Sequence, residues 1–424
     1  MNSATLGEYR VGRLPLTLAH NSTRGLVFKM MEKLEYGQIT VHDSGKTFTF
    51  GHDSELQAQI TVHSPSLYTK ILLGGSIGAG EAYFEGLWDA DNLTAVIRIL
   101  VLNMELLERM EKGLALLLTP LRLVSHRIRN NSRNGAKRNI LAHYDLGNDM
   151  YASFLDDAMM YSSAIYPSPE SSLEEASKNK LDIICTKLQL HPGDHVIEIG
   201  TGWGGLAIHA ARHFGCRVTT TTISREQYDY ACRQVQQAGL TVRIDVLMRD
   251  YRDLDGRYDK LVSVEMIEAV GHHYLDRYLA TIDGLLKPDG LALVQAITIE
   301  DFRYQSALKS VDFIKRYIFP GSFIPSLSAI TASMARATRL GLIELADFGA
   351  SYALTLRHWR QRFDAAWDDI SATGFDETFR RRWQFYLAYC EGGFRERAIS
   401  DVHLLLAGPG FRPMRTTGLT GVHA

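Results

Sequence analysis

Three glycines after a short apolar run carry the first chemical signal. Gly200, Gly202 and Gly205, in the segment VIEIGTGWGGLA, satisfy G-x-G-x-x-G, the spacing of a nucleotide-binding turn between a strand and a helix. A nicotinamide enzyme needs an acidic side chain about 20 residues further on, at the end of the second strand. Here that strand ends in TTTTIS, and the acidic residue instead precedes the glycines, at Glu198.

Two carboxylates around this turn favour S-adenosylmethionine as the ligand. Glu198 lies at the carboxyl edge of its strand, where it can accept a hydrogen bond from the ammonium group of an amino-acid moiety. Asp250, in the triplet RDY after the third strand, can accept from the amino group of adenine. The alternative is that the glycines serve only the close packing of a helix on a strand.

These residues need a sheet that brings the ends of several strands together. From about residue 180, strand and helix patterns alternate, with strands expected at 195–200, 216–224, 241–248, 258–266 and 290–299. A last apolar run, DVHLLLAG, predicts a final strand. This alternation predicts an α/β protein with a doubly wound, mostly parallel, Rossmann-like sheet.

Four regions are expected along the chain. A small α+β lobe takes residues 1–120, a basic linker follows at 121–140, and the α/β domain spans 141–408. Within that domain, residues from about 303 to 359 interrupt the alternation and predict an insertion over the active site. The tail at 409–424 is expected to be disordered.

The composition is that of a globular protein without a strong charge bias. The formal net charge of −2 over 424 residues predicts no nucleic-acid partner. The four cysteines form no C-x-x-C pair, which is typical of reduced thiols in a cytoplasmic protein. The adjacent His272 and His273 lack a third ligand, so no metal site is expected. No apolar run approaches the roughly 20 residues of a membrane span, and the N-terminus shows no signal-peptide pattern.

One local charge cluster stands out between residues 122 and 138, where six Lys or Arg side chains occur without any acidic residue. One interpretation is a solvated linker. The other is a basic patch next to an amphipathic helix, the combination that docks on an anionic membrane surface.

Eight segments in order give the chain a family resemblance. They are HYDLGNDMY, MMYSSAIYP, VIEIGTGWGGLA, TISREQ, RDYRDL, VSVEMIEAVG, YIFPGSFIPS and FGASYALTL. With them the chain resembles the cyclopropane-fatty-acyl-phospholipid synthases and their relatives, the mycolic acid cyclopropane synthases and fatty-acid C-methyltransferases. The resemblance implies a class I methyltransferase fold that uses S-adenosylmethionine, in a cytoplasmic protein associated peripherally with the inner face of the membrane.

The resemblance and the residues above together predict a set of cofactor contacts. The set is Tyr161, Ser162, Glu198, Gly200, Gly202, Trp203, Ile223, Ser224, Gln227, Asp250 and Tyr251. A sulfonium is a cation, and an aromatic face such as that of Tyr161 or Trp203 stabilises a cation by roughly 0.5–2 kcal/mol. The alternative for these two side chains is ordinary core packing.

The acceptor implied by the resemblance is the cis double bond of an unsaturated phospholipid acyl chain. Methyl transfer to an alkene leaves a carbocation, so the enzyme must align the reactants and keep the pocket free of water. Loss of a proton from the new methyl group then closes a cyclopropane ring, and loss from elsewhere gives a methylene or a shifted alkene.

In the family, a bound bicarbonate is implicated as the base that takes this proton. Its holders correspond here to Ser163, Glu268, Gln295, Ile297 and Tyr352. Serine replaces the usual cysteine, and glutamine stands where many cyclopropane synthases have histidine. Both residues still offer hydrogen-bond donors, so the departures bear on the product more than on the fold.

Three functions therefore stay open. The first is a lipid-modifying C-methyltransferase of the cyclopropane synthase type, with a methyl- or methylene-branched chain as the alternative product. The second is a methyltransferase acting on another alkene or on an amine. The third is a non-catalytic lipid-binding protein with the same fold. Family analogy is also compatible with a homodimer.

Overall fold

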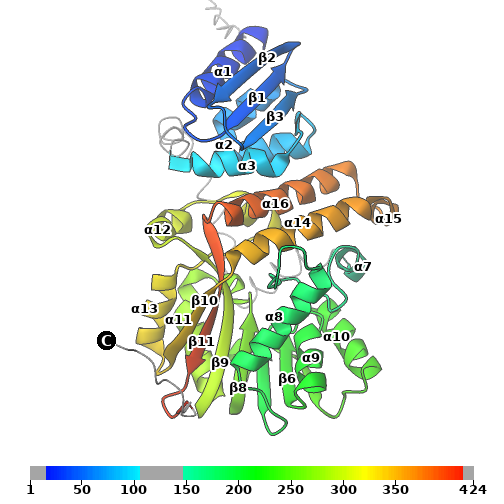
Figure 1. Cartoon of the computed structure of the whole chain (residues 1–424), viewed down its shortest axis with the longest axis vertical. Helices are drawn as coiled ribbons and strands as arrows, with labels where there is room; N and C mark the ends of the chain where they lie inside the picture. The colour runs from blue at the N-terminus through cyan, green and yellow to red at the C-terminus, as the bar shows by residue number, and fades with distance from the viewer. Residues whose placement is uncertain (1–15, 106–146, 414–424) are drawn as a thin grey trace, which may run out of the picture. The chain divides into compact units, whose positions relative to one another are not determined.

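The computed structural model describes residues 16–105 and 147–413. The chain divides into two compact units (Figure 1), one formed by Met1–Thr119 with Glu377–Phe385 and the other by Pro120–Asp376 with Tyr386–Ala424. The predicted basic linker at 121–140 lies outside the described residues, as do the first residues of HYDLGNDMY and the end of the predicted tail, 414–424.

The N-terminal unit is built on a small mixed sheet. Its strands are β1 (Gln38–Asp43), β2 (Lys46–Gly51), β3 (Gln57–Val62) and β4 (Trp88–Ala90), in the order β2-β1-β3-β4. β1 is antiparallel to β2 and parallel to β3. The helices are α1 (Leu16–Met31), α2 (Ser66–Phe84) and α3 (Leu93–Leu102).

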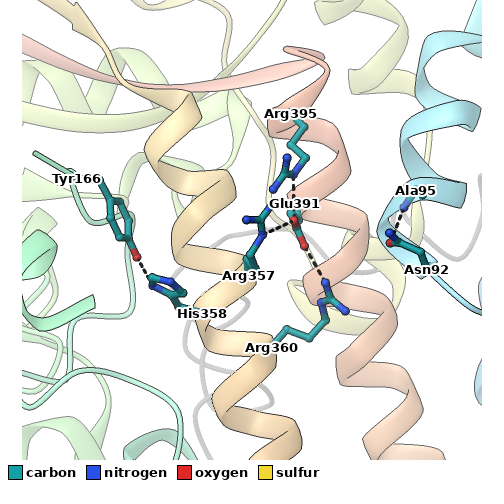
Figure 2. Close-up of polar contacts among 8 residues, drawn as sticks. All are labelled: Asn92, Ala95, Tyr166, Arg357, His358, Arg360, Glu391 and Arg395. Atoms are coloured by element: carbon teal, nitrogen blue, oxygen red, sulfur yellow. Dashed lines mark hydrogen bonds and ion pairs between the residues drawn. The ribbon is translucent and has the colours of Figure 1, made fainter. Parts of the chain in front are cut away.

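A helix cap and a contact from a distant helix stabilise this unit. Helix α3 begins after Asn92, whose side chain accepts a hydrogen bond from the backbone N–H of Ala95 at 3.0 Å (Figure 2) and so caps the first turn. The first half of helix α16 (Glu377–Arg395) belongs to the same unit. From it, the Arg381 guanidinium lies 4.2 Å from the centroid of the Tyr83 ring and donates to the Tyr83 carbonyl oxygen.

The larger unit holds a seven-stranded sheet in the order β10-β11-β9-β8-β5-β6-β7. The parallel strands are β5 (His195–Ile199), β6 (Arg217–Thr222), β7 (Ile244–Met248), β8 (Tyr258–Val264) and β9 (Leu286–Ile299). β11 (Ile399–Ala407) is antiparallel to both of its neighbours, β9 and β10 (Gly341–Asp347), so β10 runs in the direction of the parallel strands. The predicted α/β class and its mostly parallel sheet are confirmed.

Successive residues of the central strands pack against helices on opposite faces of this sheet. Ile197 and Leu261 belong to the core beneath α11 (Leu275–Leu285) and α13 (Leu327–Ala337). Their neighbours Val196 and Val262 belong to a second core. The helices over this second core are α8 (Leu173–Lys187), α9 (Gly205–His213) and α10 (Arg225–Gln237). Apolar side chains on both faces explain why these strands read as continuous apolar runs.

The segment expected to be an insertion, at about 303–359, is more than a covering loop. It contains most of α12 (Asp301–Lys309), then α13, the edge strand β10 and the start of α14 (Gly349–Ala365). β10 pairs with β11 and so extends the main sheet. Within the described ranges, no helix is both long enough and apolar enough to cross a bilayer.

Candidate active site

A pocket opens at the carboxyl ends of β5, β6 and β8, where this type of sheet binds nucleotides. Ten of the eleven predicted cofactor residues line it: Tyr161, Ser162, Glu198, Gly200, Gly202, Trp203, Ile223, Gln227, Asp250 and Tyr251. The remaining one, Ser224, caps α10 by accepting a hydrogen bond from the Gln227 N–H. Its role is therefore to hold Gln227 at the pocket.

The turn between β5 and α9 is shaped by its glycines. The backbone N–H groups of Gly200 and Thr201 both donate to the Thr221 carbonyl oxygen of β6, at 3.1 and 3.0 Å. Gly202 has φ +53°, and a Cβ atom added there would meet nothing within 4 Å. The left-handed backbone favours glycine at this position, and the open space beside it is consistent with a ligand passing close to the main chain.

Glu198 is the buried carboxyl of the pocket, at 3% exposure. Its Oε2 accepts a hydrogen bond from Thr220 Oγ1 at 2.5 Å. Burial raises the pKa of Glu198 to about 8, opposed by the Thr220 hydroxyl. An ammonium group beside it would restore the charged form, so this carboxyl fits the amino-acid end of S-adenosylmethionine.

The opposite end of the pocket carries the residues expected at the nucleoside. Both carboxylate oxygens of Asp250 accept from the Arg252 guanidinium, at 2.8 and 2.5 Å. Gln227 Oε1 accepts from Thr222 Oγ1 at 2.8 Å, which leaves its amide NH₂ for other partners. These contacts fix both side chains at the pocket edge before any ligand binds.

Aromatic side chains form one wall of the site. The Tyr161 ring stacks on Trp359 with 5.2 Å between centroids, and its hydroxyl lies 3.0 Å from that of Tyr386. Trp203 donates from Nε1 to Asn148 Oδ1 at 2.7 Å. Phe319, one of the aromatics of the covering segment, lies 6.4 Å from the Tyr161 ring. Tyr161 and Trp203 thus belong both to the pocket and to the packed aromatic wall.

Helix α14 is held in place by contacts outside the pocket, drawn in Figure 2. Glu391 of α16, only 2% exposed, pairs with Arg357 and Arg360 of α14 and with Arg395 of its own helix. Tyr166 OH and His358 Nδ1 are 2.8 Å apart.

This second contact ties the segment MMYSSAIYP to α14. That segment carries Ser163, and α14 carries Tyr352. Two of the predicted holders of the base are thus positioned by one helix and one anchored loop.

Three of the predicted bicarbonate holders converge on a carboxylate of the chain itself, Glu265. Its Oε1 accepts from the backbone N–H of Ser163 at 2.7 Å and from Gln295 Nε2 at 2.9 Å. Its Oε2 accepts from the Tyr352 hydroxyl at 2.7 Å. Glu265 also lines the cofactor pocket and keeps part of its surface open.

The bicarbonate expected from the resemblance does not fit this arrangement, because its donors are already bound to Glu265. The second Gln295 Nε2 hydrogen goes to Asp401 Oδ2, at 2.7 Å. The Ser163 hydroxyl donates to the Ala164 carbonyl oxygen, at 2.8 Å. Ser163 therefore acts through its backbone and not through the side chain that distinguishes it from cysteine.

The other two predicted catalytic residues pair with each other. Glu268 Oε1 accepts from the backbone N–H of Ile297 at 2.6 Å. Its Oε2 is buried and has no hydrogen-bond partner within the described part of the chain. Burial, with the neighbouring Glu265 charge, raises the pKa of Glu268 to about 8. Glu268 is thus a neutral acid at pH 7.

Further buried titratable groups surround Glu265. Burial raises the pKa of Asp401 well above its ordinary value, with the charges of Glu265 and Glu268 adding to it. Burial lowers the pKa of Lys180, opposed by the charge of Glu265. Burial lowers the pKa of His403 to about 3, so this ring is neutral.

The backbone at Glu265 is unusual. Its φ of +46° lies in the left-handed region, where a non-glycine residue costs about 1–3 kcal/mol when the surroundings impose the conformation. Its N–H donates to the Gln295 carbonyl oxygen at 3.0 Å, which pins the residue directly after β8.

Sequence reasoning missed Glu265, Lys180, Asp401 and the aromatic pair Trp359 and Tyr386. One signal was present: Glu265 precedes Glu268 by three residues in VSVEMIEAVG, at the carboxyl end of a predicted strand. The others come from α8, α14, α16 and β11, and nothing in their local sequence marks them. The described residues hold no group of His, Cys, Asp and Glu suited to a metal ion.

The sheet order and the pocket at the ends of β5 and β6 define an S-adenosylmethionine-dependent methyltransferase. Solved structures support this class. The cyclopropane synthase MmaA2 from Mycobacterium tuberculosis has a TM-score of 0.60 and 26% identity, covering 64% of this chain and 98% of its own. Mycolic acid cyclopropane synthase CmaA1, complexed with SAH and CTAB, has a TM-score of 0.60 and 28% identity over the same shares.

The chain belongs to the mycolic acid cyclopropane synthetase family, whose family model matches residues 131–404. It is similar to tuberculostearic acid methyltransferase UfaA1 of Mycobacterium tuberculosis, with 40% identity over 82% of this chain and 83% of the relative. It is also similar to the cyclopropane-fatty-acyl-phospholipid synthase of Escherichia coli, with 38% identity over 81% of this chain and 86% of the relative.

Proposed function

We propose that this methyltransferase acts on the cis double bond of an unsaturated phospholipid acyl chain and closes a cyclopropane ring there. One observation carries the proposal. Glu265 lines the cofactor pocket and also accepts hydrogen bonds from Ser163, Gln295 and Tyr352. This position brings a proton acceptor to the pocket proposed to bind the methyl donor. The likeness to the Escherichia coli synthase supports the same reaction.

S-adenosylmethionine, when bound, supplies an electrophilic methyl group from its sulfonium centre. Residues of the pocket would bind and orient it: Glu198 would accept from the ammonium group, Gln227 and Asp250 would hold the nucleoside, and Tyr161 would offer an aromatic face to the positive sulfur. The aromatic wall excludes water, which would otherwise trap a carbocation as an alcohol.

The N-terminal lobe is proposed to engage lipid. Large apolar side chains are exposed on it, with Leu26 at 47% and Leu73 at 55% exposure. Together with the basic residues of the 121–140 linker, such side chains favour peripheral contact with an anionic membrane surface, which we place at the cytoplasmic face.

Lipid mass spectrometry tests the function directly. The full chain, S-adenosylmethionine and vesicles of a cis-monounsaturated phospholipid are incubated, and the acyl chains are analysed before and after catalytic hydrogenation. A gain of one CH₂ that resists hydrogenation supports the ring. Absence of any CH₂ gain, with cofactor binding intact, contradicts lipid methyl transfer.

A methyl- or methylene-branched chain is the second candidate product. Gln295 stands where many cyclopropane synthases have histidine, and the relative at 40% identity is named for a methyltransferase. A CH₂ gain whose double bond takes up hydrogen would favour a methylene-branched chain or a methyl-branched chain that keeps a double bond.

A further inference from the structure

Glu265 lies where two parts of the site meet. The residue lines the cofactor pocket, and its carboxylate is held by three donors from separate segments, the Ser163 N–H, the Gln295 amide and the Tyr352 hydroxyl. We propose that Glu265 is the base of the reaction and replaces the bicarbonate of related enzymes with a carboxylate built into the chain. This inference rests on the proposed function.

The donor geometry is that of a site for a small planar anion. Each oxygen of Glu265 accepts at least one hydrogen bond of 2.7–2.9 Å, and the donors come from the MMYSSAIYP segment, β9 and α14. A carboxylate and a bicarbonate present the same pair of oxygens on a trigonal carbon. The glutamate therefore satisfies the donors that the external ion would otherwise bind.

Charges around the site favour Glu265 as the ionised member of its cluster. Burial raises the pKa of all three neighbouring carboxyls, Glu265, Glu268 and Asp401. Only Glu265 is opposed by the Lys180 ammonium together with hydrogen bonds from Tyr352 and Ser163.

The remaining titratable groups near Glu265 are consistent with one anion. Asp156, on the segment after α7 (Asn148–Ala152), interacts with Lys180, and burial raises its pKa. Burial also raises the pKa of Tyr352 and of Tyr386 well above the ordinary value, so both phenols stay protonated. His403 of β11 is neutral. The charge of Lys180 lowers the pKa of Glu265, and the charge of Glu265 raises the pKa of Lys180, so each favours the charged form of the other.

The backbone gives an independent reason to assign a function to this side chain. Glu265 has φ +46°, a conformation that glycine adopts without strain. A glutamate at a position that suits glycine is explained when its carboxylate is needed there, because strained residues of this kind concentrate at functional sites.

Methyl transfer uses the alkene π pair for the new C–C bond, and the neighbouring chain carbon becomes positive. A lone pair on a Glu265 oxygen then takes a proton from the added methyl group, forming an O–H bond. The C–H electron pair becomes the third side of the ring, so the positive charge ends as the proton on Glu265. That proton leaves to solvent before the next turnover.

Substitution with bicarbonate rescue tests the assignment. Turnover of Glu265→Gln, Glu265→Gly and the exposed control Glu344→Gln is measured on phospholipid vesicles in carbonate-free buffer, then with added bicarbonate. We expect wild type and Glu344→Gln to be unaffected by bicarbonate, and both Glu265 variants to lose about 10²-fold or more in kcat. Bicarbonate should restore Glu265→Gly, where the donors are vacated, and not Glu265→Gln, whose amide still fills the space.

Binding gives a second readout that needs no turnover. Line broadening of ¹³C-bicarbonate should appear with Glu265→Gly and be absent with wild type, while calorimetry with S-adenosylmethionine checks that each variant still binds the cofactor. A wild-type rate that depends on bicarbonate, or bicarbonate binding to wild type, would overturn the proposal. If wild type modifies no lipid, the proposed function fails, and the binding experiment still decides whether Glu265 occupies the anion position.

Discussion

Thr220 donates its hydroxyl hydrogen to Glu198 Oε2 across 2.5 Å, and both side chains are buried at the base of the cofactor pocket. The threonine comes from β6 and the glutamate from β5, paired directly across the two strands. Glu198 is thus held in place in a setting that favours its neutral form.

Cofactor binding should release a proton from Glu198. The pKa of this carboxyl is raised to about 8 in the unliganded protein, and an ammonium ligand lowers it by favouring the carboxylate. Between about pH 5 and 7, affinity for S-adenosylmethionine should therefore rise with pH, by up to about tenfold per unit. Calorimetry in buffers of different ionisation enthalpy measures the released proton. Glu198→Gln should abolish it, whereas the surface variant Glu226→Gln should not.

The same shift predicts how stability depends on pH. The folded, unliganded protein keeps a proton on Glu198 between the ordinary value of 4.5 and about 8, where the unfolded chain has lost it. Its contribution to stability is complete below about pH 4.5 and is lost as the pH rises through about 8, at up to about 1.4 kcal/mol per pH unit. Thermal unfolding of Glu198→Gln should show a flatter pH dependence than wild type; parallel curves would contradict this reasoning.

Glu268→Gln should impair turnover without affecting cofactor binding. Glu268 is a neutral acid beside Glu265 with one oxygen unpartnered among the described residues, and an amide cannot pass a proton on. We expect kcat to fall about 10²-fold and the Kd for S-adenosylmethionine to stay within error. A large loss of cofactor affinity would contradict this assignment, because it would mean that Glu268 serves cofactor binding.

Gln295→His should raise the cyclopropane fraction of the product. Gln295 Nε2 donates to both Glu265 and Asp401, and an imidazole adds a group that can be charged next to the carboxylate. Because Ser163 contacts Glu265 through its backbone, adding Ser163→Cys should give no further change. A product profile that is unchanged by Gln295→His would show that the side chain at position 295 does not influence proton removal.

Membrane attachment is expected to depend on the basic stretch. Replacing Arg122, Arg127, Arg129 and Arg133 with glutamine should weaken co-sedimentation with anionic liposomes at low salt, because each cation near such a surface contributes about 1 kcal/mol.

A matched control for this experiment removes four exposed arginines of the catalytic unit, namely Arg225, Arg336, Arg397 and Arg412. Equal binding losses in both quadruple variants would indicate a general charge effect and not a docking segment.

The sheet was predictable because buried parallel strands have an unbroken apolar pattern. β10 was not, since this edge strand exposes Leu342, Ile343 and Leu345 and lies within a segment without a clear period. The residues that reach the site only through tertiary contacts were not predictable from sequence for another reason. Asp401 acts at the site only because β11 pairs with β9 beside Gln295, and no local pattern encodes that pairing.

The cofactor end of the site followed from sequence more fully than the catalytic end. Glycines and a carboxylate at one strand end belong to a single turn, so their spacing carries the information. The role of Glu265 depends on a left-handed backbone and on donors from three distant segments. Neither can be derived from the letters VSVEMIEAVG alone.

The left-handed backbone at position 265, directly after β8, makes this position informative in related chains. Glycine suits that backbone and would leave the three donors vacant, whereas the glutamate of this chain fills them. The residue at this position in homologues should therefore distinguish chains that must bind an anion from solution from chains that have a carboxylate of their own at that place.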